Sequence, residues 1–499
     1  MNRRRFLATL AAAGATWRSR GARAGEATLR KTNIVLILAD DLGYGDVRCL
    51  NPRSQIPTPH MDRVAREGMI FADGHAAAAV CTPTRYAVVT GRYPWRSRLK
   101  SGVLNGYSPH LIEPKRLTVG SLLKGAGYHT ACVGKWHLGM DWAFTDAKRK
   151  TIDYAKPVAH GPQAKGFDYF FGIPASLDFP PYVYVENDRA VEPATATQRR
   201  VSFPAFVRSG PRSPGFHHVE ALDVLTGKAT GYIAQRAKTG QPFLLYFALT
   251  APHKPVLPAP RFRGATKLGP YGDFVVQTDW AVGQVLKALD DAGVAGDTLL
   301  IVTSDNGSFM FRQTDAAKPD HVANASVQAY KPSSHRSNHV YRGTKADIWE
   351  GGHRVPFLVR WPARVKPGSR CDAPVCVVDF MATCADVAGS ILPRDAAEDS
   401  FSIVPHLLGR APATPRAPVI HQSANGSLAL REGRWKLVMT DGSGGRERPR
   451  GKRFGKPYRL FDIVADPTES RDLAAEHPDL VARLTQQAEA LIQAGRSRS

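Results

Sequence analysis

The stretch Asn33-Ile34-Val35-Leu36-Ile37-Leu38, followed by Ala39-Asp40-Asp41, decides the fold of this chain. The apolar residues of this run do not alternate with polar ones. Such a pattern is typical of a parallel strand that is covered on both faces. Similar runs cover 243–249 and 298–303. Between the runs lie helical patterns over 60–68, 84–90, 117–126 and 273–292. Strands that alternate with helices predict an α/β protein built on a parallel sheet.

Polar residues stand at the ends of the three runs. Asp40 and Asp41 follow the first, His253 lies near the end of the second, and Asp305-Asn306 follows the third. Ligands of such sheets bind at the carboxyl ends of the strands, so these side chains are expected to converge. Carboxylate and amide oxygens favour a hard cation, Ca²⁺ or Mg²⁺. Taken singly, each pair is also compatible with a turn or a helix cap.

The segment Cys81-Thr82-Pro83-Thr84-Arg85 suggests a reactive site. Pro83 is expected at the first position of a helix that runs through Thr90. Cys81 then lies at the helix N-terminus, where the partial positive charge favours anions, and Arg85 follows about one turn later. The alternative interpretation is an inert buried thiol, which is common for a single cysteine.

The N-terminus predicts a signal peptide over residues 1–24. Met1-Asn2-Arg3-Arg4-Arg5-Phe6-Leu7 precedes an apolar run to Trp17, and Ala22-Arg23-Ala24 offers a cleavage site. The arginines followed by Phe-Leu resemble a twin-arginine (Tat) signal. We therefore expect an exported protein, periplasmic or extracellular; a frayed N-terminal helix is the alternative.

The remaining chain is expected to form two parts, a catalytic domain over 25–395 and a C-terminal subdomain over 396–499. Short strand-like pieces occur at 427–431, 434–438 and 458–461. A helix is expected after Pro478, with apolar residues on one face. These patterns predict a small antiparallel sheet that packs with a helix. The apolar residues of that helix face are Leu480, Leu484, Ala488 and Leu491.

Composition narrows the class of protein. Hydrophobic residues make up 43% and charged residues 22% of the 499 residues, as in ordinary globular proteins, and no run of 18 apolar residues predicts a transmembrane helix.

Lys+Arg minus Asp+Glu is 67 − 44 = +23, or 23 − 6 = +17 without the six arginines of residues 1–24. This excess favours a polyanionic partner, unless it is merely a solvated basic surface. Export and the lack of a reader motif favour a sulfated or otherwise acidic polymer over nucleic acid. Six cysteines in this length imply no disulfide framework.

Cys81-x-Pro83-x-Arg85, continued by Thr90-Gly91-Arg92, resembles the signature of the type I sulfatases of the alkaline phosphatase superfamily. The resemblance spans roughly residues 31–475. It implies an alkaline-phosphatase-like sandwich of a mostly parallel sheet between helices, with a smaller C-terminal antiparallel sheet packed with a helix. The other motifs follow in the family's order: Ala39-Asp40-Asp41-Leu42-Gly43-Tyr44-Gly45, Gly134-Lys135-Trp136-His137-Leu138-Gly139, Ala251-Pro252-His253-Lys254-Pro255, Ser304-Asp305-Asn306-Gly307 and Lys345-Ala346-Asp347-Ile348-Trp349-Glu350-Gly351-Gly352.

The resemblance also implies a role for each matching residue. Cys81 is expected to be oxidised to formylglycine (3-oxoalanine) by a formylglycine-generating enzyme, and its hydrated form is the expected nucleophile. One Ca²⁺ is expected, held by an oxygen of residue 81 and by four further residues. Arg85 is expected to steady the hydrated aldehyde. The four further calcium ligands are Asp40, Asp41, Asp305 and Asn306, and the residues expected around the sulfate are Lys135, His137, His253 and Lys345.

Elementary chemistry supports these roles. The oxygens of a sulfate ester repel an anionic nucleophile, and a divalent cation with Lys, Arg and His cations offsets that repulsion. A serine would be left as a stable sulfate ester, whereas a geminal diol can expel the sulfate by re-forming the aldehyde. The leaving alcohol needs an acid and the expulsion step needs a base, for which His253 and His137 are the candidates.

We therefore predict an exported, calcium-dependent sulfatase of sulfated poly- or oligosaccharides, with 6-O-sulfated hexosamines as one suggested substrate. Alternatives are a phosphodiesterase or phosphonate hydrolase of the same superfamily, and a catalytically silent module that binds sulfated glycans. A module that only binds glycans would need neither the Cys-x-Pro-x-Arg motif nor the histidines at positions 137 and 253. Candidate sugar contacts, which could equally be ordinary loops, are 105–116 and 307–340 with His321, His335, Arg336 and His339.

Overall fold

The computed structural model describes residues 32–148, 151–313 and 327–498. Its central feature is a ten-stranded sheet in the order β14-β2-β13-β10-β1-β9-β3-β4-β5-β6. The predicted strand β1 (Asn33–Asp40) lies in the interior of this sheet, parallel to β10 (Thr298–Ser304) on one side and to β9 (Phe243–Pro252) on the other. All of its residues are buried, as its unbroken apolar run predicts.

The other strands extend the sheet on both sides. Parallel pairs join β9 to β3, β3 to β4 and β2 to β14, whereas β13 runs antiparallel to both β10 and β2. The sheet is therefore mixed but mostly parallel. The bounds are β2 Met69–His75, β3 His129–Lys135, β4 Tyr169–Ile173, β5 Val185–Glu186, β6 Arg189–Ala190, β13 Phe357–Arg360 and β14 Ser369–Cys376.

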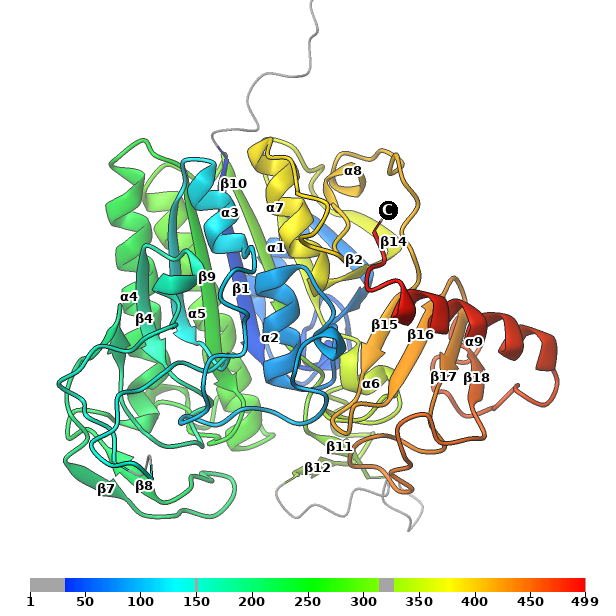
Figure 1. Cartoon of the computed structure of the whole chain (residues 1–499), viewed down its shortest axis with the longest axis horizontal. Coiled ribbons are helices and arrows are strands. Elements are labelled where there is room, and N and C mark those ends of the chain that lie inside the picture. The colour runs from blue at the N-terminus through cyan, green and yellow to red at the C-terminus, as the bar shows by residue number, and fades with distance from the viewer. Residues whose placement is uncertain (1–31, 149–150, 314–326, 499) are drawn as a thin grey trace, which may run out of the picture.

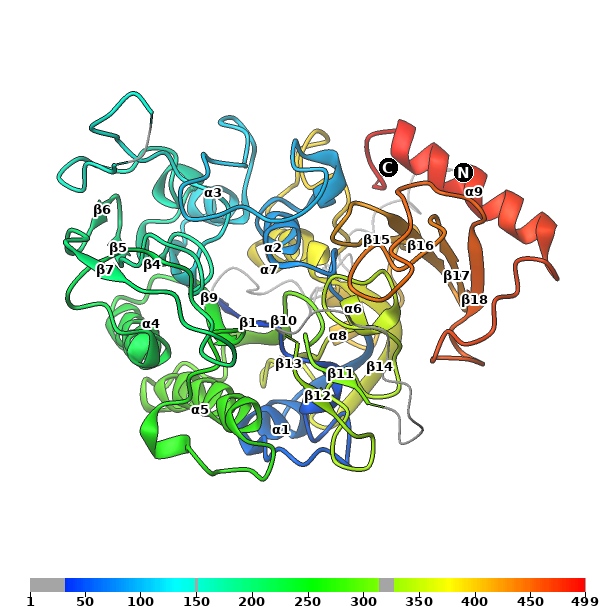
Figure 2. The ribbon, with the colours of Figure 1, turned by 90° about the horizontal axis from the view of Figure 1, so that it is seen from below.

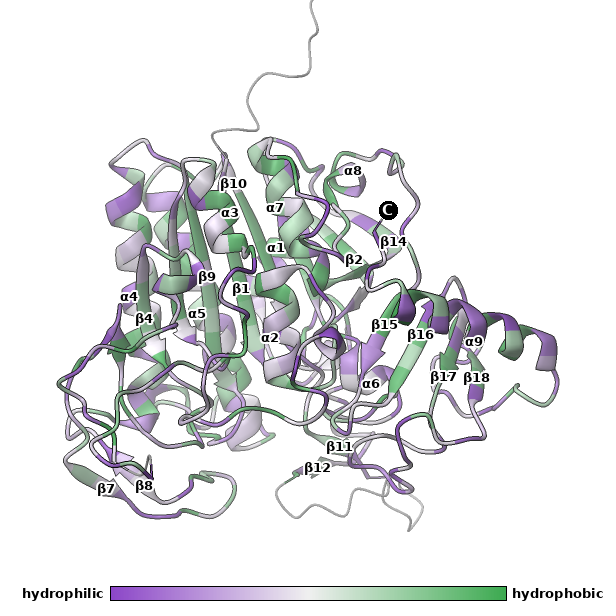
Figure 3. Cartoon of the chain, in the orientation of Figure 1, coloured by the Kyte–Doolittle hydropathy of each residue, from purple (hydrophilic) through white to green (hydrophobic). Residues whose placement is uncertain are grey.

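Helices cover both faces of the sheet (Figures 1 and 2). Alternate residues of β1 face opposite sides, so Leu36 and Leu38 pack in the core under α2, α3 and α7, and Val35 and Ile37 pack in the core under α1, α4 and α5. Figure 3 shows the central strands as the most apolar part of the ribbon. The bounds are α1 Pro59–Arg66, α2 Cys81–Thr90, α3 Val119–Gly125, α4 Ala221–Ala237, α5 Pro270–Asp291, α6 Glu350–His353, α7 Phe380–Ala388 and α8 Val404–Leu407.

A second, four-stranded antiparallel sheet lies beside the first, with α9 (Pro478–Gln493) packed on it (Figure 2). Leu484 and Ala488 of the predicted apolar face are fully buried there, because they lie one helical turn apart. The predicted fold class is thereby confirmed. The strands are β15 Val419–Gln422, β16 Leu428–Glu432, β17 Trp435–Val438 and β18 Arg459–Asp462.

Two short strand pairs outside the large sheet occur in the described residues of the long segments 175–218 and 307–340, the first antiparallel and the second parallel. β7 (Ala196–Gln198) pairs with β8 (Gly210–Arg212), and β11 (Phe311–Arg312) pairs with β12 (Ala329–Tyr330). In Figure 1 these pairs lie below the large sheet. That is the end at which β1, β9 and β10 finish.

Three further expectations can be compared with the structure. Helix α2 begins at Cys81, two residues before the predicted start at Pro83, because a proline within the first turn removes no helical hydrogen bond. The six cysteines are unpaired. Within the described ranges, none of the helices has the length and hydropathy needed to cross a bilayer. The predicted signal peptide, residues 1–24, lies outside the described residues.

Candidate active site

The carboxyl ends of four strands bring the predicted residues together. Asp40 ends β1, Lys135 ends β3, His253 directly follows β9, and Asp305 directly follows β10. All four side chains are buried. The next residue after β1, Asp41, has a φ of 67° and His137 has a φ of 55°, a left-handed conformation that is costly for a residue with a side chain. Such strain gathers at functional sites, where the surrounding structure maintains it.

Three buried cations pair with three buried carboxylates in this centre. Lys135 Nζ lies 2.6 Å from Asp40 Oδ2, and Arg85 Nη2 lies 2.7 Å from Asp305 Oδ2. The third pair joins Lys345 to Asp41 at 2.6 Å. The lysine and arginine side chains come from β3, from α2 and from the loop before α6. The charges of the buried pairs balance, which makes their common burial tolerable.

Cys81 lies beside these pairs at the start of α2. Its Sγ is 3.4 Å from Lys345 Nζ, and it is 2% exposed. Single donor atoms of Asp40, Asp41, Cys81 and His253 all lie within 4.8 Å of one another. Burial raises the pKa of the Cys81 thiol to about 11, so it stays protonated at neutral pH. A protonated thiol is a poor nucleophile, and Cys81 in this form is not suited to attack an ester.

Two oxygens of the centre have no hydrogen-bond partner within the described part of the chain. They are Asp40 Oδ1 and Asn306 Oδ1, and both are buried. Asn306 holds its amide towards Asp41, because its Nδ2 donates to Asp41 Oδ1 at 2.6 Å. Burial raises the pKa of Asp40 to about 7 despite the charge of Lys135. Unpaired oxygens in a carboxylate-rich centre form a donor set that suits a hard divalent cation.

The two predicted histidines are held through one ring nitrogen each. His137 Nε2 lies 2.8 Å from the Leu104 carbonyl and donates to it, while its Nδ1 is buried without a partner among the described residues. His253 Nδ1 lies 2.5 Å from the Lys254 carbonyl, and its Nε2 lies 3.6 Å from Asp41 Oδ2. Burial and the nearby lysines lower the pKa of both imidazoles well below the usual value. Both rings are therefore neutral and able to accept a proton.

Two further cations border the centre, one inside a sequence motif and one outside every motif. Lys254 directly follows His253, and Arg446 comes from the loop between β17 and β18. The Arg446 backbone N–H donates to Asp347 Oδ1 at 2.5 Å, two residues beyond Lys345. Lys254 is part of a motif, so its position was visible in the sequence. Nothing in the sequence around Arg446 marks it, because only the packing of the second sheet places it there.

Some of the predicted sugar-contact residues are buried within the protein, and others are exposed. His335 is buried, and its Nε2 lies 2.8 Å from Asp46 Oδ1, so this ring stabilises the loop after β1. His339 packs against the rings of Tyr44 and Tyr341. Within 105–116, Asn105 and Pro109 are exposed. His321 lies outside the described residues.

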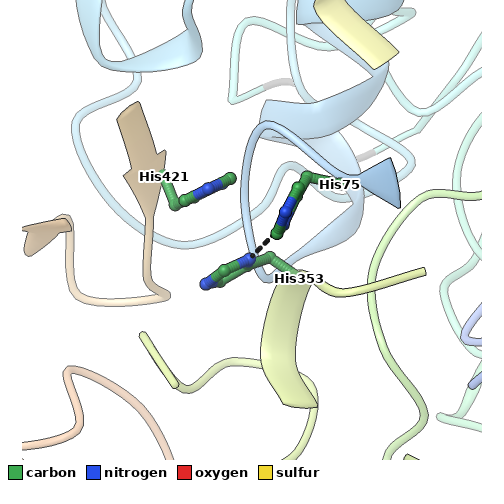
Figure 4. Close-up of side chains that lie close together, drawn as sticks. All are labelled: His75, His353 and His421. Carbon is green, nitrogen blue, oxygen red and sulfur yellow. Dashed lines mark hydrogen bonds between the residues drawn. The ribbon is translucent and has the colours of Figure 1, made fainter. Parts of the chain in front are cut away.

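A second histidine cluster lies apart from this centre (Figure 4). His75, at the end of β2, contacts His353 of α6 through their Nδ1 atoms at 3.2 Å, and His353 stacks on His421 of β15 with ring centroids 3.8 Å apart. Asp73 accepts from His75 Nε2 at 2.6 Å, and Lys436 Nζ lies 3.2 Å from His353 Nε2. A chain of hydrogen bonds from Lys436 through both rings to Asp73 accounts for this arrangement. The cluster therefore ties the C-terminal sheet to the segment that leads into Cys81.

Lys436 is the buried cation on which this cluster depends. It is fully buried and lies 3.1 Å from Glu350 Oε1 and 2.7 Å from Glu469 Oε1. Lys436→Met should lower the free energy of unfolding by about 3–5 kcal/mol, because it removes the buried cation shared by Glu350 and Glu469. Urea unfolding measures the loss. Lys287→Met is the matched control, since the pair of Lys287 with Asp291 is exposed and worth at most about 1 kcal/mol. Equal stability of both variants would contradict a structural role for the cluster.

Comparison with known proteins identifies relatives over most of the chain. The family description "Sulfatase" matches residues 32–390. An N-acetylgalactosamine-6-O-sulfatase of Bacteroides thetaiotaomicron is 33% identical, with 92% of each chain covered, and human arylsulfatase A is 30% identical, with 93% of this chain and 88% of that protein covered. A solved structure from work on glycosaminoglycan metabolism by B. thetaiotaomicron superposes with a TM-score of 0.79 at 32% identity, covering 93% of this chain and 99% of that one. The family match spans every motif of the candidate site, and the chain belongs to the sulfatase family of sulfuric ester hydrolases.

Proposed function

We propose that this protein is an exported sulfatase that removes sulfate from acidic poly- or oligosaccharides, with the 6-O-sulfate of an N-acetylgalactosamine residue as the first candidate. The observation that carries the proposal is the buried contact of Cys81 with Lys345 inside a centre of paired cations and carboxylates. The name of the B. thetaiotaomicron relative, at 33% identity over 92% of the chain, supports the choice of sugar. A net charge of +17 without residues 1–24 suits a polyanionic substrate.

Residue 81 is proposed to act as formylglycine. The protonated, buried Cys81 thiol is unsuited to attack, whereas a hydrated aldehyde at the same position supplies one hydroxyl to take the sulfuryl group and a second to expel it. Arg85 lies one helical turn further on, where its guanidinium can steady that group. The formylglycine-generating enzyme would read Cys81-x-Pro83-x-Arg85 before α2 packs, because α2 is buried along its whole length.

Calcium is the proposed metal, and residues present in the centre fit it. Asp40, Asp41, Asp305 and Asn306 would hold the ion together with an oxygen of residue 81. Asp40 Oδ1 and Asn306 Oδ1, which accept no hydrogen bond within the described part of the chain, are the oxygens that support this site. When bound, the ion would supply positive charge for the sulfate oxygens and for the nucleophile.

The remaining side chains would bind the sulfate and move protons. Lys135 and Lys345 would share their charges between the carboxylates and the sulfate oxygens. His137 Nδ1 carries a lone pair with no other partner in the described structure, which supports its proposed role as the base. His253 presents Nε2 to the centre while its Nδ1 is held by the Lys254 carbonyl. A proton on that Nε2, stabilised once the anionic substrate is bound, would pass to the leaving alcohol.

The pH dependence of the reaction tests the base. Burial and the charge of Lys135 lower the pKa of His137 well below its usual value of 6.5. A base with a lowered pKa stays unprotonated as the pH falls through 6.5, so kcat, which includes the expulsion step, should fall only in more acidic solution. The profile of kcat against pH measures this limb. An acidic limb that persists unchanged in His137→Gln would contradict the assignment of His137 as the base.

Two measurements on one preparation test the proposed function. The mass of the peptide that contains Cys81 separates the thiol from the aldehyde. Sulfate release from N-acetylgalactosamine 6-sulfate, compared with hydrolysis of a phosphodiester and a phosphonate ester, separates the sulfatase from its superfamily rivals. Glycan binding without sulfate release, on an unmodified Cys81, would identify a silent binding module and overturn the proposal.

We also propose the organisation of the chain. The change from the large sheet, whose last strand in the chain is β14, to the four-stranded sheet, which begins with β15, supports a division into 25–395 and 396–499. Export by the twin-arginine route rests on the sequence of residues 1–24. N-terminal sequencing of the protein from a periplasmic fraction would test it, with a start near residue 25 as the expected result.

A further inference from the structure

The loop between β17 and β18 carries a dense group of positive charges. Residues 446–456, called the basic loop below, contain six basic side chains and one acidic side chain, Glu447. Glu447 accepts from Arg342 Nε at 2.9 Å, so a residue outside the basic loop already takes its charge. The basic residues are Arg446, Arg448, Arg450, Lys452, Arg453 and Lys456.

Three cations of the basic loop are exposed and have no acidic partner. Arg448, Arg450 and Lys456 face solvent, and within the ranges that the structure describes none of them lies at ion-pair distance from a carboxylate. The nearby acid Asp441 accepts from the Lys452 backbone N–H at 2.8 Å and lies at the base of the loop. Like charges gathered so closely repel each other, and a polyanion that lies across them would relieve this repulsion.

Hydrogen bonds order the backbone that presents these charges. The Ser443 N–H donates to the Pro449 carbonyl at 2.9 Å, and the Gly444 N–H donates to the Arg450 carbonyl at 2.7 Å. The two arms of the segment are thereby held together like those of a hairpin. A surface that is ordered before binding loses less conformational entropy when a ligand arrives.

Aromatic rings stand between the cations of the basic loop. The Phe454 side chain is 40% exposed, and the Arg453 guanidinium lies 4.9 Å from the centre of its ring. Lys456 Nζ lies 5.8 Å from the Tyr458 ring. An exposed ring beside cations offers an apolar surface to a sugar ring whose acidic groups contact the charges.

The basic loop begins beside the candidate active site. The backbone N–H groups of Arg446 and Glu447 donate to Asp347 Oδ1 at 2.5 and 3.0 Å, and Asp347 lies two residues beyond Lys345. From there the loop runs outward to its exposed cations, at the lower end of the molecule in Figure 1, where β1, β9 and β10 finish. A polymer with one sulfated sugar in the centre can therefore continue across this loop.

We propose that the basic loop is a binding surface for a polyanionic saccharide chain, and that it holds the chain of which one sulfated sugar occupies the candidate active site. The exposed cations bind the sulfates or carboxylates of the neighbouring sugars, and Phe454 contacts a sugar face. The surface raises the affinity for a polymer without contacting the scissile group. This inference rests on the proposed sulfatase function.

The triple variant Arg448→Gln/Arg450→Gln/Lys456→Gln tests the surface in the whole protein. Its affinity for chondroitin 6-sulfate chains, measured by calorimetry, should be about tenfold weaker than that of wild type, because each exposed ion pair is worth about twofold and three act together. Rising salt should weaken polymer binding less steeply in the variant, since fewer counterions are released. The rates on 4-nitrophenyl sulfate and N-acetylgalactosamine 6-sulfate should stay within about twofold of wild type.

The matched control removes the same three charges from the other end of the sheet. Arg66 ends α1, Lys238 follows α4 and Lys366 lies between β13 and β14, and all three are exposed. The variant Arg66→Gln/Lys238→Gln/Lys366→Gln should keep the polymer affinity within about twofold of wild type. An equal loss in both triple variants would show that only net charge matters and would overturn the surface.

The remaining outcomes separate this inference from the proposed function. Unchanged polymer affinity in the basic-loop variant, with normal cleavage of the small esters, would overturn the surface and leave the sulfatase standing. Binding of vesicles with anionic phospholipid, or of duplex DNA, more tightly than of chondroitin 6-sulfate would assign the loop to another partner and overturn the inference. No sulfate release from any probe would overturn the proposed function, whereas a loss of polymer affinity confined to the basic-loop variant would still support the surface.

Discussion

Cys81→Ala should reduce sulfate release by roughly 10⁴-fold or more, because loss of a nucleophile removes the covalent route altogether. The methyl group of alanine can neither be oxidised to an aldehyde nor accept a sulfuryl group. The fold should survive, since Cys81 makes its side-chain contact with Lys345 and no disulfide. Sulfate release measures the loss, and a melting curve close to that of wild type confirms folding. Undiminished activity would contradict the mechanism.

The substitution Cys81→Ser tests whether the second hydroxyl of the hydrated aldehyde is needed. A serine hydroxyl can take the sulfuryl group once, but it has no second hydroxyl on the same carbon with which to expel it. We expect a single turnover followed by a stable sulfate ester at position 81, visible as an added sulfuryl group in the mass of that peptide. Repeated turnover by this variant would show that the second hydroxyl of a hydrated aldehyde is unnecessary.

Asp305→Asn should remove calcium and lower activity by on the order of 10³-fold, since metal stabilisation of transition-state charge is worth several kcal/mol. Its Oδ2 accepts from two nitrogens of Arg85, at 3.1 and 2.7 Å, and neither side chain is exposed. Burial would raise the pKa of Asp305, but Arg85 lowers it, so the carboxylate is ionised. Removing its charge leaves Arg85 without its nearest partner, and the free energy of unfolding should fall by about 3–5 kcal/mol.

Two measurements separate these effects. Calcium per chain, determined by elemental analysis after dialysis, reports the ligand role, and urea unfolding reports the ion pair. Asp290→Asn is the control, because its pair with Arg63 is partly exposed and should be worth about 1 kcal/mol or less. Unchanged calcium content in Asp305→Asn would remove this residue from the metal site, even if stability fell as expected.

Much of the fold could be predicted because its signals are local. The strands β1, β9 and β10 are hydrophobic at almost every position. Such a continuous run is typical of a strand that is covered on both faces. The exact start of α2 does not follow from the sequence, because a proline is equally acceptable at several positions of a first helical turn. The convergence of Asp40, His253 and Asp305 followed from parallel strands that end at one edge of a sheet.

The chemistry of individual groups was harder to foresee. The sequence placed His335 and His339 among possible sugar contacts, whereas His335 pairs with Asp46 and His339 packs against tyrosines. The same sequence gave no sign that His75, His353 and His421 meet, because they lie on three elements far apart in the chain. Side-chain surroundings depend on long-range packing, which short patterns do not contain.

By itself the sequence determined the α/β class, the order of the motifs and the residue types that a sulfatase centre needs, since these depend on local hydropathy and on motifs of a few residues. Only the tertiary structure decided which carboxylate pairs with which cation, and which oxygens, Asp40 Oδ1 and Asn306 Oδ1, have no hydrogen-bond partner among the described residues. It also brought the loop that carries Arg446, from the second sheet, against the residues that follow Lys345. The physical reason is that charges interact through space over a few ångströms, whatever their separation along the chain.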